Sequence, residues 1–433
     1  MNAGTVEANG TELDLVNTTV TNTNGTVEAI GTGVLNLKGA TINGGTVSTA
    51  ASTDVIEATS GISTISGTSS FVNAGTVEAN GAELDLVNTT VTNTNGTVEA
   101  IGTGVLNLKN VTVNGGTLGG AGTIATATGN TDSTLNGVTV AGGSKVAAAV
   151  GTLDLTGIIT NKGEIDATTG TLDLESATVN GGTLGVFGVV DSSGISFITG
   201  ATIVNSGNIE VTSGTLTIDP TPVTNNGTIE VTGDGTLVLS GETITNSVNG
   251  KIQVDATTGT LDLENATING GTLGGAGTIA TAAGNTDSTL NGVTIATGSK
   301  VTAAVGTLDL TGTITDNGEL DAALGGTIDL ESVTIIGGTL GGAGTIATAA
   351  GNTDSTLNGV TIAAATLVTA AVGTLDLTGT ITYKGVIDAT TGTLDLENAT
   401  VNGGTLGGAG TIATAAGNTD STLNGVTIAT GSK

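Results

Sequence analysis

The sequence predicts an all-β protein, a parallel β-solenoid of the right-handed β-helix class with about 20 coils of about 22 residues. Three observations predict this fold. The 433 residues include 74 Gly but only 2 Pro, and aromatic residues are rare. Short phrases recur along the whole chain, and apolar residues alternate with polar ones inside each phrase. We therefore expect a single continuous solenoid array over residues 1–433.

The composition favours strands over helices and over disorder. The apolar residues are mainly Val, Ile, Leu and Ala, and the branched ones among them suit strands. A Gly inside a helix costs about 1 kcal/mol relative to Ala, so a chain this rich in Gly is a poor helix former. Hydrophobic residues make up 37% of the chain, which is too many for a disordered protein.

Repeats occur at two lengths. Residues 259–300 recur at 392–433 with one conservative difference, and residues 2–38 recur nearly unchanged at 73–109. Inside these long units, a Gly is followed two residues later by a branched aliphatic residue and an acid, and then by Leu-x-Leu. The inner spacing is about 22 residues or close to a multiple of it. An array of β-sandwiches or a β-propeller would repeat at larger spacings and fits this pattern poorly.

Each phrase has the period of a strand. In residues 171–175, Leu172 and Leu174 alternate with polar residues, so both leucines are expected to face the core while Asp173 faces outward. The same phrase at 260–264 makes the same prediction. Asn-Gly and Gly-Gly pairs between the runs supply the positive φ angles that corners need. One coil cannot close a core, but stacking at about 4.8 Å pairs the backbone and buries the aliphatic side chains.

One segment, residues 185–222, departs from the repeats. It contains Phe187, Phe197 and the sequence Asp-Pro-Thr-Pro at 219–222. This individual character predicts an irregular coil, or a loop that leaves the solenoid.

Charge and cysteine content exclude several classes of function. The chain has only 8 basic residues and 38 acidic ones, which gives a net charge of −30, and it has no His and no Cys. Without a basic stripe, nucleic acid is excluded as a partner and an anionic membrane surface is disfavoured. No apolar run approaches 18 residues, so no direct membrane span is expected. The absence of Cys excludes disulfides and thiolate metal sites.

Acidic residues form the first candidate site, because several occupy one slot of consecutive coils. Like charges stacked at the rung spacing repel, and a divalent cation would relieve the repulsion. Recognised calcium-binding patterns are missing, however, so the sequence favours a solvated acidic face and no metal site. The residues of this predicted acid ladder are Glu7 and Glu28, Glu78 and Glu99, and Glu210, Glu230 and Gln253.

Catalysis and ice binding are both disfavoured. The chain has no His and no Arg, and its acids occupy repeated positions instead of one singular constellation, so we expect no catalytic residues, no cofactor and no enzyme activity. Thr-x-Thr rows, for example at 19–21 and 313–315, would suit an ice-binding face. The rows are irregular, and Thr is a common outward-facing strand residue.

The phrases at 226–231, 235–239 and 259–263 resemble the repeats of large secreted adhesins of Gram-negative bacteria. These include autotransporter passenger regions, filamentous-haemagglutinin-like proteins and the giant repeat proteins of rhizobia. The resemblance covers most of the chain. It implies a structural, adhesive rod of the outer-membrane surface or a secreted one, located outside the cell, that binds glycans or proteins of host or neighbouring cells. The alternative is a carbohydrate-binding or polysaccharide-acting β-helix.

The two ends of the sequence both match interior copies of the repeat, and no signal segment follows Met1. We expect the chain to be a fragment of a longer extracellular protein. Terminal coils that match interior coils leave strand edges open, which predicts end-to-end self-association.

Overall fold

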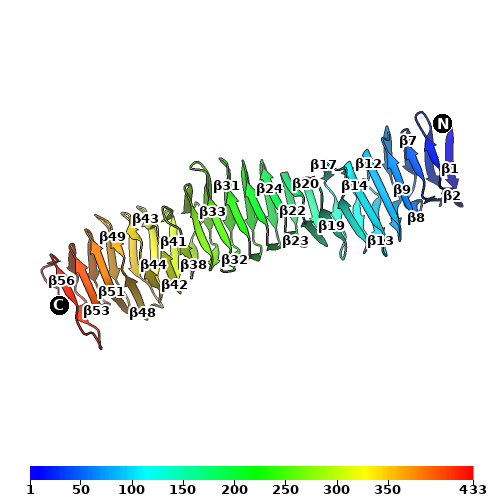
Figure 1. Cartoon of the computed structure of the whole chain (residues 1–433). Coiled ribbons are helices and arrows are strands. Elements are labelled where there is room, and N and C mark those ends of the chain that lie inside the picture. Colours follow the sequence, from blue (N-terminus) through cyan, green and yellow to red (C-terminus); the bar gives the residue numbers. More distant parts are fainter. Residues whose placement is uncertain (433) are drawn as a thin grey trace. The chain divides into compact units, whose positions relative to one another are not determined.

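The computed structural model describes residues 1–432, which form strands and no helix (Figure 1). The strands stack in parallel, two or three to a coil, and the chain makes about 21 turns. The predicted all-β parallel solenoid is therefore confirmed. None of the described residues forms a helix able to cross a membrane. The chain divides into two compact units, Met1–Glu210 and Val211–Lys433, each of which is a stack of such coils.

Unit 1 begins with a coil of three strands, β1 (Thr5–Asn9), β2 (Glu12–Val16) and β3 (Thr19–Thr21). The next strand, β4 (Thr26–Ile30), pairs residue by residue with β1. The remaining strands are β5 (Val34–Lys38), β6 (Thr41–Asn43), β7 (Thr46–Thr49), β8 (Val55–Ser60), β9 (Ile62–Ser66), β10 (Ser70–Asn73), β11 (Thr76–Asn80), β12 (Glu83–Thr92), β13 (Thr97–Ile101), β14 (Val105–Asn114), β15 (Thr117–Gly119), β16 (Thr123–Thr126), β17 (Asp132–Asn136), β18 (Thr139–Val140), β19 (Lys145–Ala148), β20 (Thr152–Asn161), β21 (Glu164–Ala167), β22 (Thr171–Asn180), β23 (Thr183–Val186), β24 (Val189–Ser193), β25 (Ile195–Thr199), β26 (Thr202–Asn205) and β27 (Asn208–Val211).

Unit 2 repeats this arrangement. Its strands are β28 (Thr215–Asp219), β29 (Val223–Asn225), β30 (Thr228–Val231), β31 (Thr236–Ser240), β32 (Thr243–Asn246), β33 (Lys251–Val254), β34 (Thr260–Glu264), β35 (Thr267–Asn269), β36 (Thr272–Gly275), β37 (Thr278–Thr281), β38 (Asp287–Asn291), β39 (Thr294–Ile295), β40 (Lys300–Ala303), β41 (Gly306–Thr311), β42 (Thr313–Asp316), β43 (Glu319–Ala322), β44 (Gly326–Leu330), β45 (Thr334–Ile336), β46 (Thr339–Gly341), β47 (Thr345–Thr348), β48 (Asp354–Asn358), β49 (Thr361–Ile362), β50 (Leu367–Ala370), β51 (Thr374–Tyr383), β52 (Val386–Ala389), β53 (Thr393–Asn402), β54 (Thr405–Gly407), β55 (Thr411–Thr414), β56 (Thr422–Asn424) and β57 (Thr427–Ile428).

The core of each unit consists of aliphatic side chains stacked rung upon rung. In unit 1, Leu153 pairs with Leu172, and Leu155 pairs with Leu174. All four are fully buried, as the alternation of the sequence predicts. Burying a side chain of this size stabilises the fold by roughly 1.5–3 kcal/mol, so the repeated stacks are the main source of stability.

The corners are held by buried asparagine side chains and by glycine. Asn73 donates from Nδ2 to Oδ1 of Asn93 at 2.7 Å and to the carbonyl oxygen of Thr97 at 2.9 Å. Asn93 in turn donates to the carbonyl oxygen of Gly115 one coil further on. Gly116 has a φ of 69°, and a Cβ there would lie 1.9 Å from the carbonyl oxygen of Asn93. The corner therefore requires glycine both for its φ angle and for space.

The segment 185–222, for which the sequence predicts an irregular coil, extends across the boundary between the units. Its part in unit 1 includes the end of β23 and the strands β24, β25 and β26, which are joined by corners of one or two residues. Its aromatic side chains are turned outward, with Phe187 56% and Phe197 42% exposed. The Pro-containing corner lies in unit 2, between β28 and β29.

Candidate functional site

Three glutamates of unit 1 are stacked on consecutive rungs of the solenoid. Glu78 on β11 lies between Glu57 on β8 and Glu99 on β13, one residue on each neighbouring rung. The pairing of Glu78 with Glu99 confirms part of the predicted acid ladder, and Glu7 pairs with Glu28 in the same way. Sequence reasoning missed Glu57, because its phrase at 54–58 begins with Asp instead of the Gly that marks the other phrases.

Glu78 is the most confined member of this column. It is 9% exposed, and burial, together with Glu57 and Glu99, raises its pKa to about 8. In the equivalent slot of unit 2, Glu230 pairs with Gln253, whose Nε2 donates to Oε2 of Glu230 at 3.1 Å. A glutamine in the column thus replaces a repulsion between carboxylates with a hydrogen bond. Glu210 of the predicted ladder belongs to unit 1.

A second acidic column lies on the outer face of β20, β22 and β24. Asp154 pairs with Asp173, which pairs with Asp191. One carboxylate oxygen each from Asp154, Asp173 and Glu175 lies within 4.8 Å of the other two. These three residues, called the Asp154 cluster below, are the group in the described part of the chain whose geometry suits a metal ion. Asp173 lies on the outer face, as predicted, but it is partly buried between its neighbours.

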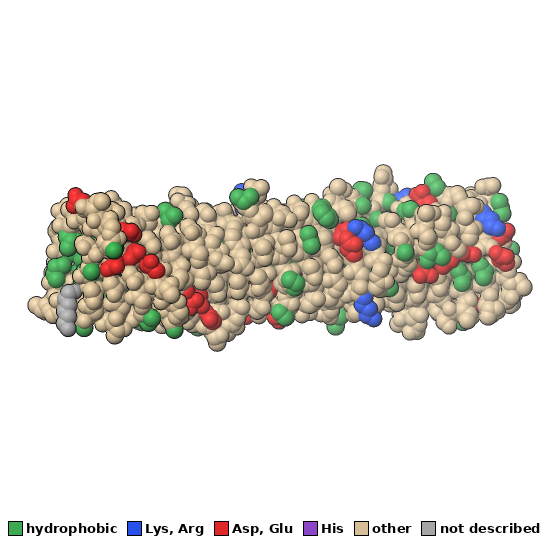
Figure 2. All heavy atoms as spheres, turned by 90° about the horizontal axis from the view of Figure 1, so that it is seen from below, with side chains coloured by type: hydrophobic (Ala, Val, Ile, Leu, Met, Phe, Trp, Pro, Cys, Tyr) green, Lys and Arg blue, Asp and Glu red, His purple; other side chains and the backbone are tan. Residues whose placement is uncertain are grey.

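Electrostatics in the Asp154 cluster are unfavourable for charged carboxyls. Burial first, and then contact with Asp132, raises the pKa of Asp154 to about 7. Burial and the charge of Asp191 raise the pKa of Asp173 to about 6. Both carboxyls therefore lose their protons less readily than an ordinary aspartate does. Figure 2 shows that, on the face it displays, acidic side chains gather in a few patches separated by uncharged surface.

Lysines neutralise other acidic positions of unit 1. Lys38 Nζ lies 2.6 Å from Oδ2 of Asp14, and Lys109 Nζ lies 2.6 Å from Oδ2 of Asp85. Asn107 also donates to Asp85 at 2.8 Å. These acids differ from the Asp154 cluster because each has a cation and an amide beside it.

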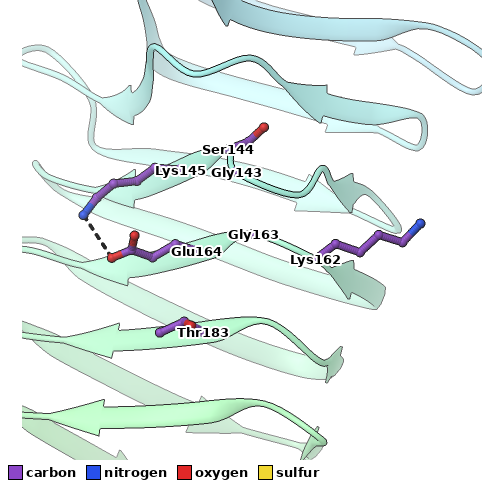
Figure 3. A pocket seen from close by; sticks show the side chains of 7 residues that line it. All are labelled: Gly143, Ser144, Lys145, Lys162, Gly163, Glu164 and Thr183. Atoms are coloured by element: carbon purple, nitrogen blue, oxygen red, sulfur yellow. Dashed lines mark hydrogen bonds and ion pairs between the residues drawn. The ribbon is translucent and has the colours of Figure 1, made fainter.

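A shallow hollow of about 290 Å³ lies along β19 and β21 of unit 1 (Figure 3). Lys145 Nζ lies 3.2 Å from Oε1 of Glu164 and also contacts the buried Asp166. The side chain of Lys162 points away from this ion pair. The hollow is lined by Gly143, Ser144, Lys145, Lys162, Gly163, Glu164 and Thr183.

The ion pairs in this hollow are not unique to it. Lys300 of unit 2 repeats the arrangement, with Nζ 3.2 Å from Oε1 of Glu319 and 3.1 Å from Oδ2 of Asp321. The polar groups of both sites are thus already paired with one another. The ion pairs that line the hollow are therefore a recurring feature of the repeat.

Comparison of the chain with protein-family models, curated proteins and solved structures gave no match.

Proposed function

We propose that the chain is a structural, adhesive and non-catalytic segment of a bacterial cell-surface or secreted repeat protein. The observation that carries the proposal is repetition. Core positions, corners and ion pairs recur from coil to coil, as the Lys145 and Lys300 sites illustrate. Enzymes concentrate their chemistry in one singular constellation of groups. A repeated stack instead offers the same surface many times, which suits reach and multivalent contact.

The polar outer surface of the strands is suited to binding glycans or proteins. Outward strand positions are rich in Thr and Asn, which offer hydrogen-bond donors and acceptors, while the net charge of −30 opposes contact with nucleic acid. Many weak polar contacts, repeated at the rung spacing, add up to useful adhesion when several engage at once.

A second candidate function rests on the exposed aromatic residues. Phe187 and Phe197 are two of only three Phe in the chain, and both are exposed to solvent. Ile195, which is also exposed, lies two residues before Phe197 on β25. Exposed aromatic rings offer apolar faces on which a sugar ring can pack. This observation favours a carbohydrate-binding β-helix whose binding surface lies on unit 1.

Adhesion measured with the purified chain separates the two candidates. Beads coated with the chain should bind to surfaces of host or neighbouring bacterial cells, whereas beads coated with heat-unfolded chain should not. Phe187→Ala with Phe197→Ala should leave that binding within about twofold under the adhesive proposal. A loss of tenfold or more, together with binding to defined glycans, would favour the carbohydrate-binding function. Release of reducing ends from polysaccharides would overturn the non-catalytic proposal.

A further inference from the structure

A glutamate side chain lies inside a corner of unit 2. Glu242, between β31 and β32, is only 3% exposed. Both of its carboxylate oxygens are buried, and neither makes a hydrogen bond of normal geometry within residues 1–432. The backbone N–H groups of Ser240 and of Glu242 itself favour the charged carboxylate, but burial outweighs them. Because a buried charge without a cation or several donors is costly, the enclosed side chain is favoured in its protonated form.

The adjoining rungs place small side chains next to Glu242. The pairing of β32 with β29 and with β35 puts Thr221 on one side of Glu242 and Ala266 on the other. Both neighbours are 1% exposed. The hydroxyl of Thr221 is also buried without a hydrogen-bond partner. Neither neighbour therefore brings a charge that could balance an ionised Glu242.

The corner that covers Glu242 on one side, residues 219–222, lacks a backbone hydrogen bond that the next corner makes. In that next corner, Gly241 donates its N–H to the carbonyl oxygen of Glu264 at 2.9 Å. The register places Pro220 at the position of Gly241, and proline has no N–H to donate. The corner 219–222 is therefore held to the following rung by one hydrogen bond fewer, and it opens at a lower cost.

The charged groups that act on Glu242 are both acidic. Asp219 ends β28 and Glu264 ends β34, and each disfavours a negative charge on Glu242. Burial first, and then these two neighbours, raises the pKa of Glu242 from 4.5 to about 8. A carboxyl with a raised pKa stabilises the closed structure fully below about pH 4.5. That contribution is lost as the pH rises to about 8.

We infer that protonation of Glu242 keeps the corner 219–222 closed and that ionisation of Glu242 opens this corner. In the closed state the neutral carboxyl is enclosed by the corner. In the open state the corner moves outward and water reaches the charged carboxylate, while the paired strands of unit 2 stay in place. Opening exposes the buried hydroxyl of Thr221, so the surface of unit 2 differs between acidic and alkaline surroundings.

Hydrogen–deuterium exchange of the full chain at about pH 6 and about pH 8, read by peptide mass spectrometry, tests the inference. The rates are first corrected for the intrinsic pH dependence of amide exchange. Peptides that cover 219–246 should then lose protection by about tenfold or more between the two pH values, because a proton-linked opening can shift by up to about tenfold per pH unit below the raised pKa. Peptides that cover 339–348, in β46 and β47, should keep their protection.

Three variants make the test specific to Glu242. Glu242→Gln keeps the shape of the side chain but cannot ionise, so its corner should stay protected at both pH values. If this variant folds poorly, Glu242→Ala, which repeats the Ala266 of the next rung, should give the same result. The matched control is Glu264→Gln, which leaves Glu242 in place. Its corner should still open, at a lower pH than in wild type, because one anion no longer raises the pKa of Glu242.

Three results would overturn the inference. The first is equal protection of 219–246 in wild type at the two pH values. The second is the same loss of protection in Glu242→Gln or Glu242→Ala as in wild type. The third is a loss that extends to 339–348, since it would show general unfolding of unit 2 instead of the opening of one corner.

Discussion

Glu78→Gln is expected to remove a strong pH dependence of stability from unit 1. The Glu78 carboxyl is 9% exposed between Glu57 and Glu99, and burial with these two neighbours raises its pKa from 4.5 to about 8. A carboxyl that binds its proton more tightly in the folded chain stabilises the fold fully below its unfolded pKa. That contribution is lost as the pH rises from about 4.5 through about 8.

The size of the effect follows from the shift. One unit of pKa corresponds to about 1.4 kcal/mol, and the column can relax or admit water, so we expect a loss on the order of 2–5 kcal/mol between pH 5 and pH 8.5. Gln at position 78 stays neutral over this range. Its amide can donate to a neighbouring carboxylate, as Gln253 donates to Glu230 in unit 2.

Urea denaturation followed by circular dichroism at pH 5 and pH 8.5 measures this difference. The Glu78→Gln variant should be more stable than wild type at pH 8.5 and close to it at pH 5. Glu7→Gln is the matched control, because Glu7 lies in the same Thr-Val-Glu-Ala-Asn phrase but is exposed and has only Glu28 stacked on it within the ladder. If wild type and Glu78→Gln lose the same stability between the two pH values, the electrostatic account of this column is wrong.

Two further substitutions test packing and corners. Leu174→Ala should destabilise the chain by about 2–5 kcal/mol in the same denaturation assay, because the side chain is fully buried and its rung neighbours are fixed by backbone pairing. A loss of stability below about 1 kcal/mol would contradict the assignment of Leu174 to the core. Gly116→Ala should lower the stability of the fold far more than Gly137→Ala, although both glycines have positive φ angles. A Cβ at position 116 would lie 1.9 Å from the carbonyl oxygen of Asn93, whereas a Cβ at position 137 would have no atom within 4 Å. Gly137→Ala should cost only about 1–2 kcal/mol, and equal thermal shifts for the two variants would show that steric contact does not decide the corner.

The sequence predicted the solenoid and the direction of its side chains because both depend on local pattern. Period two in 171–175 was enough to place Leu172 and Leu174 in the core, where both are fully buried. Identical phrases also align with one another, which is why Glu7 and Glu28 could be paired in advance.

Contacts between different phrases could not be predicted, because coil length varies with the corners. Asp173 pairs with Asp191, 18 residues later, whereas Leu239 pairs with Leu263, 24 residues later. An average spacing near 22 does not fix either register. Asp154 and Asp173 occupy the same slot of two Thr-Leu-Asp-Leu phrases that stack only because one short coil separates them, so the sequence indicated a ladder of glutamates and left this group of aspartates unnoticed.

The buried asparagines were also beyond the reach of sequence pattern. Asn-Gly pairs indicated corners, but Asn73 and Asn93 are fully buried and bond to the next coil. A polar residue of this type is normally placed at the surface. Only the stacking of one corner on the next supplies the partners that make burial of its amide favourable.

Exposure of the segment outside the cell is the central claim of the proposed function, and protease treatment of intact cells tests it most directly. Intact cells of the organism that encodes the chain would be treated briefly with protease, and the released peptides would be identified by mass spectrometry, with a cytosolic protein as the control for lysis. The account predicts that peptides of this chain are released from intact cells or found in the culture medium while those of the cytosolic control are not. Peptides that appear only after lysis would contradict it.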